Sequence, residues 1–141
     1  MPEASRIIIL GAGLAGCEAA YQCAKRGTAI ELWEQRPGAM TEAHRTGDFA
    51  ELVCSNSLKS QEPANAHGLL KAELNQFDSL LLRIARQTQI PGGKALVVNR
   101  QAFARQVTDA VSHMPGITLQ RRQATMIPVD GIAIIATGPL T

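Results

Sequence analysis

The chain has 141 residues, of which 45% are hydrophobic, 18% are charged and 4% are aromatic. This length is typical of one domain, and the composition excludes a disordered, collagenous or coiled-coil chain. Fourteen Lys and Arg side chains against twelve Asp and Glu give a net charge of +2, which is too small to indicate nucleic-acid binding by itself.

The cysteines and the N-terminus bear on the cellular compartment. Cys17, Cys23 and Cys54 are an odd number without the spacing of a disulfide framework, which favours a reducing setting. Residues 1–6 show no signal-peptide pattern, and no apolar run approaches the ~18 residues of a membrane span. We therefore expect a cytoplasmic protein without a membrane partner.

The first predicted elements form a strand, a turn, a helix and a second strand. Residues 6–10 contain a continuous aliphatic run, which is typical of a strand buried on both faces of a parallel sheet. Residues 14–26 predict a helix that ends at Gly27, and residues 28–33 predict the second strand. This βαβ unit predicts a parallel sheet with a right-handed crossover.

The middle of the chain is less regular. Residues 35–63 lose periodicity and predict a long loop, whose apolar patch at residues 49–54 is expected to pack against the domain. Residues 69–87 carry apolar side chains at helical spacing and predict one helix of about five turns. Residues 91–93 then break the chain before a strand at residues 95–98.

The C-terminal part returns to alternating helices and strands. Residues 100–114 predict a helix with Asn99 as its N-cap. Residues 117–120 and 125–127 predict short strands, and residues 132–136 predict another buried aliphatic strand before Thr137 and Gly138. The expected fold class is α/β, a Rossmann-like parallel sheet with flanking helices.

A glycine-rich turn follows the first strand. It reads Gly11, Ala12, Gly13, Leu14, Ala15, Gly16, and its place between a predicted strand and a predicted helix is the context of a dinucleotide-binding fingerprint. In such a turn the first glycine permits the tight turn, the second lets the backbone approach a pyrophosphate, and the third allows close helix–strand packing. The phosphates would lie at the helix N-terminus, where free N–H groups favour negative charge.

Two charged residues follow the second strand. Glu34 stands at its end, with seventeen residues between it and Gly16, where a carboxylate can accept hydrogen bonds from the ribose hydroxyls of an adenosine. Glu31 competes for this role, but it lies inside the strand. Arg36 pairs with the adenosine-side phosphate or packs on the adenine in one interpretation, and is simply exposed to solvent in the other.

The fingerprint alone does not separate FAD from NAD. The run from Gly131 to Gly138 resembles the second fingerprint of the glutathione-reductase-like flavoproteins, in which a parallel strand ends in Ala-Thr-Gly. This resemblance favours FAD and implies that Gly138 lies near the cofactor.

The middle of the chain carries a more specific resemblance. The run from Phe49 to Ser60, which contains Leu-Val-Cys-Ser-Asn-Ser-Leu, is similar to the TrmFO family of folate- and FAD-dependent tRNA (uracil-5-)-methyltransferases, as are residues 34–37, 65–66, 68–74, 78–80 and 136–141. The family implies transfer of a one-carbon unit from methylenetetrahydrofolate to C5 of a T-loop uridine in tRNA, with FAD as carrier and NAD(P)H as hydride source.

By the same resemblance, Gly11 to Gly16 and Glu34 bind FAD, and Cys54 matches a cysteine implicated in catalysis. A Cys54 thiolate that adds to C6 of uracil would make C5 nucleophilic, although a general base or a group near the flavin are alternatives. Without the resemblance, a cysteine between Val53 and Ser55 is more often a small buried hydrophobic residue. Cys17 and Cys23 are expected to pack in the core or along the helix, and the three histidines have no metal-site spacing, so no metal is expected.

The family's chain is several times longer than 141 residues. We therefore expect residues 1–141 to be the N-terminal part of an FAD-binding domain, with residues 35–90 as a loop-plus-helix insertion, and to be inactive alone. The alternatives are the related tRNA-modifying flavoproteins of the glucose-inhibited-division group and a non-catalytic dinucleotide-binding module.

Overall fold

A four-stranded parallel sheet forms one half of the molecule, in the strand order β6-β2-β1-β7. The strands are β1 (Ile7–Leu10), β2 (Ile30–Glu34), β6 (Ile117–Arg121) and β7 (Ile132–Ile135). The computed structural model describes residues 6–140; residues 1–5, for which no signal-peptide pattern is predicted, and Thr141 lie outside the described residues. The strand order is that of the nucleotide-binding half of a Rossmann-like fold, so the predicted α/β class is confirmed.

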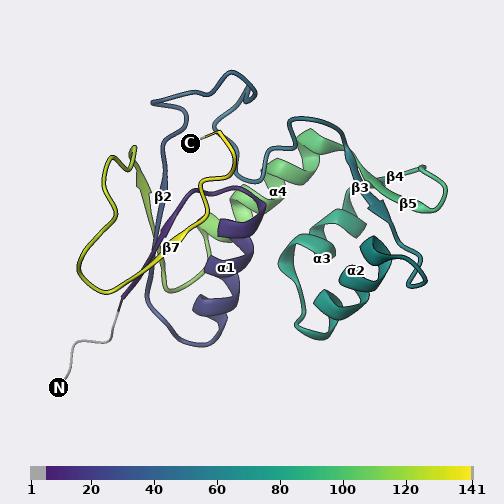
Figure 1. The fold of residues 1–141 in the computed structure, drawn as a ribbon, viewed down its shortest axis with the longest axis horizontal. Helices are drawn as coiled ribbons and strands as arrows, with labels where there is room; N and C mark the ends of the chain where they lie inside the picture. Colours follow the sequence, from purple (N-terminus) through teal and green to yellow (C-terminus); the bar gives the residue numbers. More distant parts are fainter. Residues whose placement is uncertain (1–5, 141) are drawn as a thin grey trace.

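Two helices cover one face of this sheet. Helix α1 (Leu14–Lys25) connects β1 to β2, and helix α4 (Arg100–Ser112) leads into β6. Because the strand order moves steadily from β1 to β2 to β6, right-handed crossovers place both helices on the same face, where they contact each other (Figure 1). The predicted cap of α4 is confirmed, since Asn99 Oδ1 accepts a hydrogen bond from the N–H of Ala102 at 3.1 Å.

A second unit is inserted between β2 and α4. Its antiparallel strands β3 (Ser57–Ser60), β5 (Ala95–Val98) and β4 (Gln89–Ile90) pair in that order, and the helices α2 (Ala66–Gln76) and α3 (Leu80–Gln87) pack beside them (Figure 1). The prediction of an uninterrupted loop over residues 35–63 is therefore wrong at β3. That strand depends on pairing with β5, which lies far along the chain.

The single helix predicted over residues 69–87 is also wrong, because α2 and α3 are separate. The chain turns at Asp78, whose φ of 53° lies in the left-handed region. Ser79 then caps α3 by accepting a hydrogen bond from the N–H of Leu82 at 3.2 Å. The Glu18 carboxylate of α1 accepts hydrogen bonds from the N–H groups of Leu80 and Leu81, which fixes the start of α3 against α1.

The loop after β2 is packed down at one point. Phe49 and Ala50 are fully buried in the core, and Leu52 packs against it. Val53 and Cys54 are exposed. The predicted packing of this patch is thus confirmed for Phe49, Ala50 and Leu52, whereas Val53 and Cys54 do not pack against the core.

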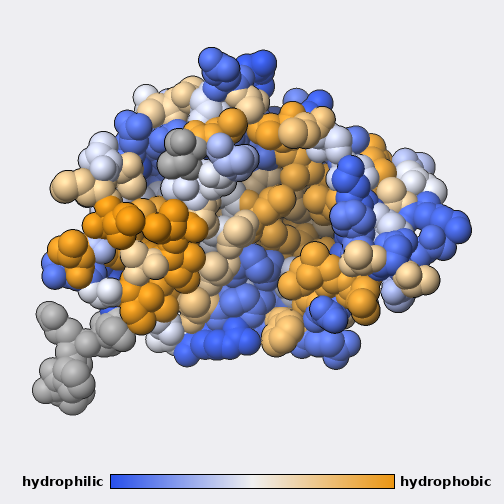
Figure 2. Space-filling view, viewed as in Figure 1, coloured by the Kyte–Doolittle hydropathy of each residue, from blue (hydrophilic) through white to orange (hydrophobic). Residues whose placement is uncertain are grey.

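The outer edge of the parallel sheet differs from the prediction of a buried strand. Strand β7 is an edge strand among the described residues, and Ile132 and Ile135 are 55% and 57% exposed. Figure 2 shows an apolar patch over β7 and the loop before it. In that loop Ile127 and Val129 are exposed. The strand predicted at residues 125–127 does not form. None of the helices between residues 6 and 140 is both long and apolar enough to cross a membrane.

Candidate nucleotide site

The glycine turn lies at the carboxyl end of β1 and touches the end of β7. Gly11 has a φ of +100°, and a Cβ atom there would lie 2.5 Å from the carbonyl oxygen of Ala136. The backbone is held on both sides, because Gly11 N donates to Trp33 O at 2.8 Å and Ala136 N donates to Leu10 O at 2.8 Å. Only glycine fits this position, for conformation and for space.

The other two glycines of the turn differ from each other. A Cβ atom on Gly16 would lie 1.8 Å from Gly11 O, so Gly16 permits the close approach of α1 to the turn. Gly13 is the N-cap of α1, has a φ of −77°, and a Cβ atom there would meet no atom within 4 Å. Gly13 therefore faces open space rather than a neighbouring element. This is the place where a ligand backbone or phosphate can approach.

The N-terminus of α1 offers free donors at the same place. Gly13 makes no side-chain cap, and in the described part of the chain the N–H groups of Leu14, Ala15 and Gly16 have no acceptor. Leu14 is 37% exposed and Ala15 is exposed. Unpaired N–H groups and the helix dipole favour an anion. The turn thus meets the geometric requirement of a pyrophosphate site.

Glu34 is buried directly beside this turn. Its carboxylate accepts hydrogen bonds from Ala12 N at 3.0 Å, Arg36 N at 2.9 Å, Arg36 Nε at 2.9 Å and Arg36 Nη2 at 3.3 Å. Burial acts to raise the pKa of the Glu34 carboxyl group, but these hydrogen bonds from Arg36 and Ala12 outweigh it and hold the pKa below its usual value. Because four donors fill the four acceptor positions of a carboxylate, a ribose hydroxyl would share or replace one of them.

Glu31, the competing candidate for the ribose, is engaged elsewhere. Its carboxylate pairs with Arg6 at 2.7 Å and accepts a hydrogen bond from Trp33 Nε1. Of the two carboxylates on β2, only that of Glu34 contacts the glycine turn.

Arg36 is 3% exposed, so the interpretation that it lies in solvent is wrong. Its guanidinium group pairs with Glu34 at 2.9 Å and with Glu51 at 3.1 Å, and it donates to the carbonyl oxygen of Thr46. With these bonds made, Arg36 orients Glu34 and ties the loop after β2 to the sheet.

Sequence reasoning missed Arg121, which holds the same loop from β6. Its guanidinium donates to Arg36 O at 2.7 Å and Gly47 O at 2.8 Å, and it stacks on the Phe49 ring at 4.5 Å from the centroid. Arg121 pairs with Glu34 in the register of β2 and β6. The sequence did offer a signal for this role, because Arg121 is a charged residue at the carboxyl end of a predicted parallel strand.

The three cysteines have different surroundings. Cys54 is exposed, and in the part of the chain that the structure describes no hydrogen bond joins it to the glycine turn. Cys17 is fully buried on α1, where its Sγ donates to Ala12 O, and burial, followed by the charge of Glu34, raises the pKa of its thiol to about 12. Cys23 is half-buried, so the expectation that Cys17 and Cys23 pack in the core or along α1 is confirmed.

The end of β7 completes the site on its other side. Ala136 contacts Gly11, as described above, and Gly138 follows with a φ of +77° and no atom within 4 Å of the position of a Cβ. Gly138 is thus favoured by its backbone conformation and not by close packing against the protein. The structure brings together residues 11–16, Glu34, Arg36 and Ala136, and it places Cys54 on the segment that leads to β3.

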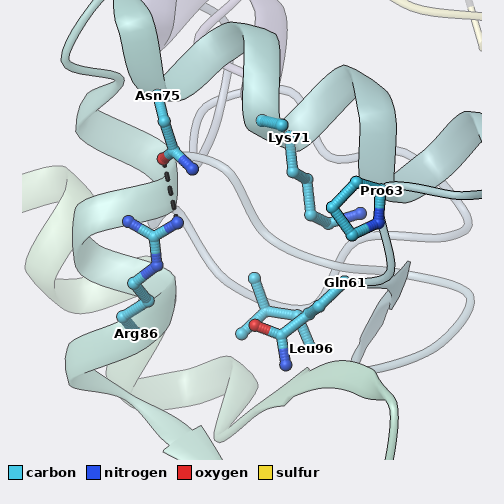
Figure 3. Close-up of a pocket in the computed structure, with 8 residues that line it drawn as sticks. Gln61, Pro63, Lys71, Asn75, Arg86 and Leu96 are labelled. Carbon is cyan, nitrogen blue, oxygen red and sulfur yellow. Dashed lines mark hydrogen bonds between the residues drawn. The ribbon is translucent and has the colours of Figure 1, made fainter.

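A separate pocket of about 160 Å³ lies in the inserted unit, between α2, α3 and β5 (Figure 3). Its cations are paired within the protein. Lys71 Nζ donates to Ser60 O and His67 O, and burial lowers the pKa of Lys71. Arg86 donates to Asn75 Oδ1 at 2.9 Å, as the dashed line in Figure 3 shows. The pocket is a packing feature of the unit. Among residues 6–140 no group of three or more His, Cys, Asp and Glu side chains is placed to hold a metal.

The chain is similar in sequence to a described family and to curated relatives. A family model described as "Glucose inhibited division protein A" matches residues 6–141. Two curated relatives named methylenetetrahydrofolate–tRNA-(uracil-5-)-methyltransferase TrmFO are 54% identical over 136 residues, from Moorella thermoacetica, and 51% identical over 141 residues, from Lactobacillus acidophilus. They cover 96% and 100% of this chain, which spans 31% and 32% of their own lengths.

Solved structures support the fold. The GidA-related protein from Thermus thermophilus superimposes with a TM-score of 0.54 at 18% identity, over 96% of this chain and 54% of that chain. The peptidyl tryptophan dihydroxylase QhpG superimposes with a TM-score of 0.50 at 20% identity, over 91% of this chain and 27% of that chain. At these identities the likeness is one of fold alone.

Proposed function

The chain belongs to the glucose inhibited division protein A family, and we propose that it is the FAD-binding part of a folate-dependent tRNA (uracil-5-)-methyltransferase. The curated relatives at 50–54% identity that carry this name support the activity. Because the chain spans about a third of their length, the activity, substrates and partners of the whole protein are part of this proposal.

The observation that carries the proposal is the form of the glycine turn. Gly11 and Gly16 are required by contacts within the protein, whereas Gly13 faces open space beside the free N–H groups of α1. A turn that served packing alone would not need a glycine at position 13. A pyrophosphate at the N-terminus of α1 would use both the space and the donors.

The residues of the chain would hold FAD as follows. The backbone of residues 11–16 binds the pyrophosphate, and Glu34 accepts a hydrogen bond from the adenosine ribose, with Arg36 as the group that orients its carboxylate. Gly138, at the end of β7, leaves room beside the cofactor. When bound, FAD supplies the redox chemistry that a one-carbon transfer from methylenetetrahydrofolate requires.

Cys54 is the proposed catalytic residue. Its exposed thiol is accessible to a nucleobase, in contrast to the buried thiol of Cys17. A Cys54 thiolate would add to C6 of uracil, with formation of an S–C6 bond and movement of the C5–C6 electron pair toward C5, which then attacks the one-carbon unit. Loss of the C5 proton and release of tetrahydrofolate would leave a methylene group at C5. A two-electron reduction of this group, with NAD(P)H as the ultimate hydride source, and departure of the thiolate would give 5-methyluridine. A role as general base, or as a group beside the flavin, is the alternative assignment.

The remaining assignments follow from the same proposal. Residues 1–141 are the N-terminal part of the FAD-binding domain, and the insertion in it includes residues 35–90 and continues through β5 to the start of α4. The substrates of the intact protein are tRNA, methylenetetrahydrofolate and NAD(P)H, its location is cytoplasmic, and it needs no structural metal. The 141-residue chain alone binds FAD at most and does not methylate tRNA.

A related tRNA-modifying flavoprotein of the glucose-inhibited-division group is the second candidate, because the family model carries that description. The names of the curated relatives favour the methyltransferase within this family.

The test uses the intact protein that contains this chain. We expect the purified protein to show the absorption spectrum of bound FAD and to form 5-methyluridine in a tRNA T-loop when methylenetetrahydrofolate and NAD(P)H are supplied. Cys54→Ala is expected to abolish methylation while FAD remains bound, and Cys23→Ala serves as the control. Methylation by Cys54→Ala at the wild-type rate would refute the catalytic assignment, and a colourless protein that does not take up FAD would refute the cofactor assignment.

A further inference from the structure

A cavity of about 380 Å³ lies outside the nucleotide site, between residues 43–53 and the first two turns of α4. Positions 100, 101, 104 and 105 of α4 form its helical wall, as expected for side chains one turn apart. Ala104 is buried at the base of this wall, and Arg100 and Arg105 are exposed on it. Arg45 lines the opposite wall.

The guanidinium groups of this cavity are largely unpaired. Within residues 6–140, Arg100 and Arg105 make no side-chain hydrogen bond or ion pair, and the side chain of Arg45 donates only to Glu42 O. This contrasts with Arg36 and Arg121, whose guanidinium groups are occupied by the loop after β2. The cavity therefore presents donors that the protein itself does not use.

The acidic residues of the cavity do not cancel this charge. Glu51 is paired with Arg36 and accepts hydrogen bonds from the backbone of Arg45 and from Thr46, so its carboxylate is already satisfied. Asp48 is the other acidic residue of the lining. The lining therefore contains three arginines and, besides the Glu51 carboxylate that is paired with Arg36, one carboxylate. The net charge of this partly enclosed space is positive, and it attracts anions.

The cavity is separate from the glycine turn, and its lining ends one residue before Cys54 in the sequence. The buried residues Phe49 and Ala50 connect its wall to the turn, and Ala50 N donates to Ala12 O at 2.9 Å. None of residues 11–16 lines the cavity, whereas Val53, the neighbour of Cys54, does. An anion bound here would thus be distinct from a cofactor pyrophosphate and close in sequence to the candidate nucleophile.

We propose that this cavity binds the phosphodiester backbone of the RNA substrate next to the nucleotide presented to Cys54. The proposal rests on the proposed function, for which it names the substrate-binding surface. Arginine forks match the geometry of phosphate oxygens, and guanidinium groups on two facing walls can contact successive phosphates. Such contacts position a nucleic acid without reading its bases.

The test measures binding of an RNA hairpin with the sequence of a tRNA T-arm to the intact protein, at several salt concentrations. The variant is Arg100→Gln/Arg105→Gln, and the charge-matched control is Arg26→Gln/Lys94→Gln, whose exposed side chains lie at the end of α1 and in the turn before β5. We expect the first variant to bind at least ~10-fold more weakly and to lower the slope of log K against log salt by about 1 to 2. The control is expected to bind within about twofold of the wild type, because rim charges far from a contact contribute little.

Other results would overturn the proposal. Equal RNA affinity and equal salt slope for wild type and Arg100→Gln/Arg105→Gln would show that the cavity does not hold the RNA backbone. A higher KM for methylenetetrahydrofolate with unchanged RNA affinity would assign the cavity to the carboxylates of the folate instead. Both results leave FAD binding and methylation by the wild type intact, so failure here is distinguishable from failure of the proposed function. The amount of bound FAD and the unfolding transition are measured for each variant, to verify that it folds like the wild type.

Discussion

The backbone N–H of Ala12 donates a hydrogen bond to the carboxylate of Glu34 at 3.0 Å, which joins the glycine turn after β1 to the end of β2. Arg36 donates to the same carboxylate through its backbone and its side chain. Glu34 therefore holds the glycine turn in place from within the protein, in addition to the ribose contact proposed for it.

Replacement of Glu34 by Gln tests this role. The amide NH₂ of a glutamine would face donors from Ala12 or Arg36, and the Arg36 guanidinium would lose its buried partner. We expect the free energy of unfolding to fall by about 2–4 kcal/mol, measured by urea denaturation. Glu42→Gln, at an exposed loop position, is the control and should change it by less than about 0.5 kcal/mol.

The same variant should alter the response to acid. Because the pKa of Glu34 is lower in the folded protein than in the unfolded chain, its stabilisation is present above the unfolded pKa and is lost as the pH falls through the folded pKa. The wild type should therefore lose more stability than Glu34→Gln as the pH is lowered below the ordinary pKa of a glutamate. Identical pH dependence of the two proteins would contradict the hydrogen-bonded carboxylate.

Gly11→Ala is expected to be far more damaging than an ordinary glycine substitution. Its Cβ would lie 2.5 Å from Ala136 O at a φ of +100°, whereas Gly27 has a φ of +82° with nothing within 4 Å. We expect Gly27→Ala to cost about 1 kcal/mol for backbone strain alone, and Gly11→Ala to cost about 3 kcal/mol or more. Thermal denaturation of the two variants measures the difference. Equal losses would show that β7 does not press against the turn as described.

The cysteines should differ sharply in reactivity. Cys54 is exposed, whereas burial raises the pKa of the Cys17 thiol to about 12. Treatment of the folded protein with iodoacetamide, followed by peptide mass spectrometry, should modify Cys54 first and leave Cys17 unmodified until the protein is denatured. Early modification of Cys17 would mean that α1 does not stay packed against the turn.

The apolar edge of the parallel sheet predicts self-association of the 141-residue chain. Ile132 and Ile135 are exposed on β7, an edge strand among the described residues, and exposed apolar edges pair with other chains. Ile135→Lys should shift the chain toward monomer in analytical ultracentrifugation. Leu69→Lys, at a position that is 50% exposed on α2, is the control and should leave the distribution unchanged. A monomeric wild type at all concentrations would refute this prediction.

The βαβ unit and the capped helix α4 could be predicted from the sequence because their signals are local. The aliphatic run of β1, the glycine turn and Gly27 lie within one short stretch, and Asn99 stands directly before α4. The separation of α2 from α3 could not be predicted in the same way. It depends on the Glu18 carboxylate of α1, which binds the first N–H groups of α3 from a distant part of the chain.

The candidate site could also be predicted only in part from the sequence. Residues 11–16 and Glu34 follow from spacing, and the structure brings them together. The burial of Arg36 was not predictable, because it results from contacts with Glu51 and Thr46 on a loop without periodicity. The exposure of Ile132 and Ile135 was likewise hidden, since an aliphatic run does not reveal whether its strand lies at the centre or the edge of a sheet.

The central claim is that residues 11–16 bind the pyrophosphate of FAD, and titration of FAD into the intact wild-type protein and its Gly13→Ala variant tests it most directly. Gly13 has a φ of −77° and open space at its Cβ position, so the variant should unfold like the wild type. The added methyl group should nevertheless weaken FAD binding by at least ~10-fold, because it occupies the approach to the N-terminus of α1. Equal FAD affinity of the two proteins, or no FAD binding by the wild type, would contradict the account.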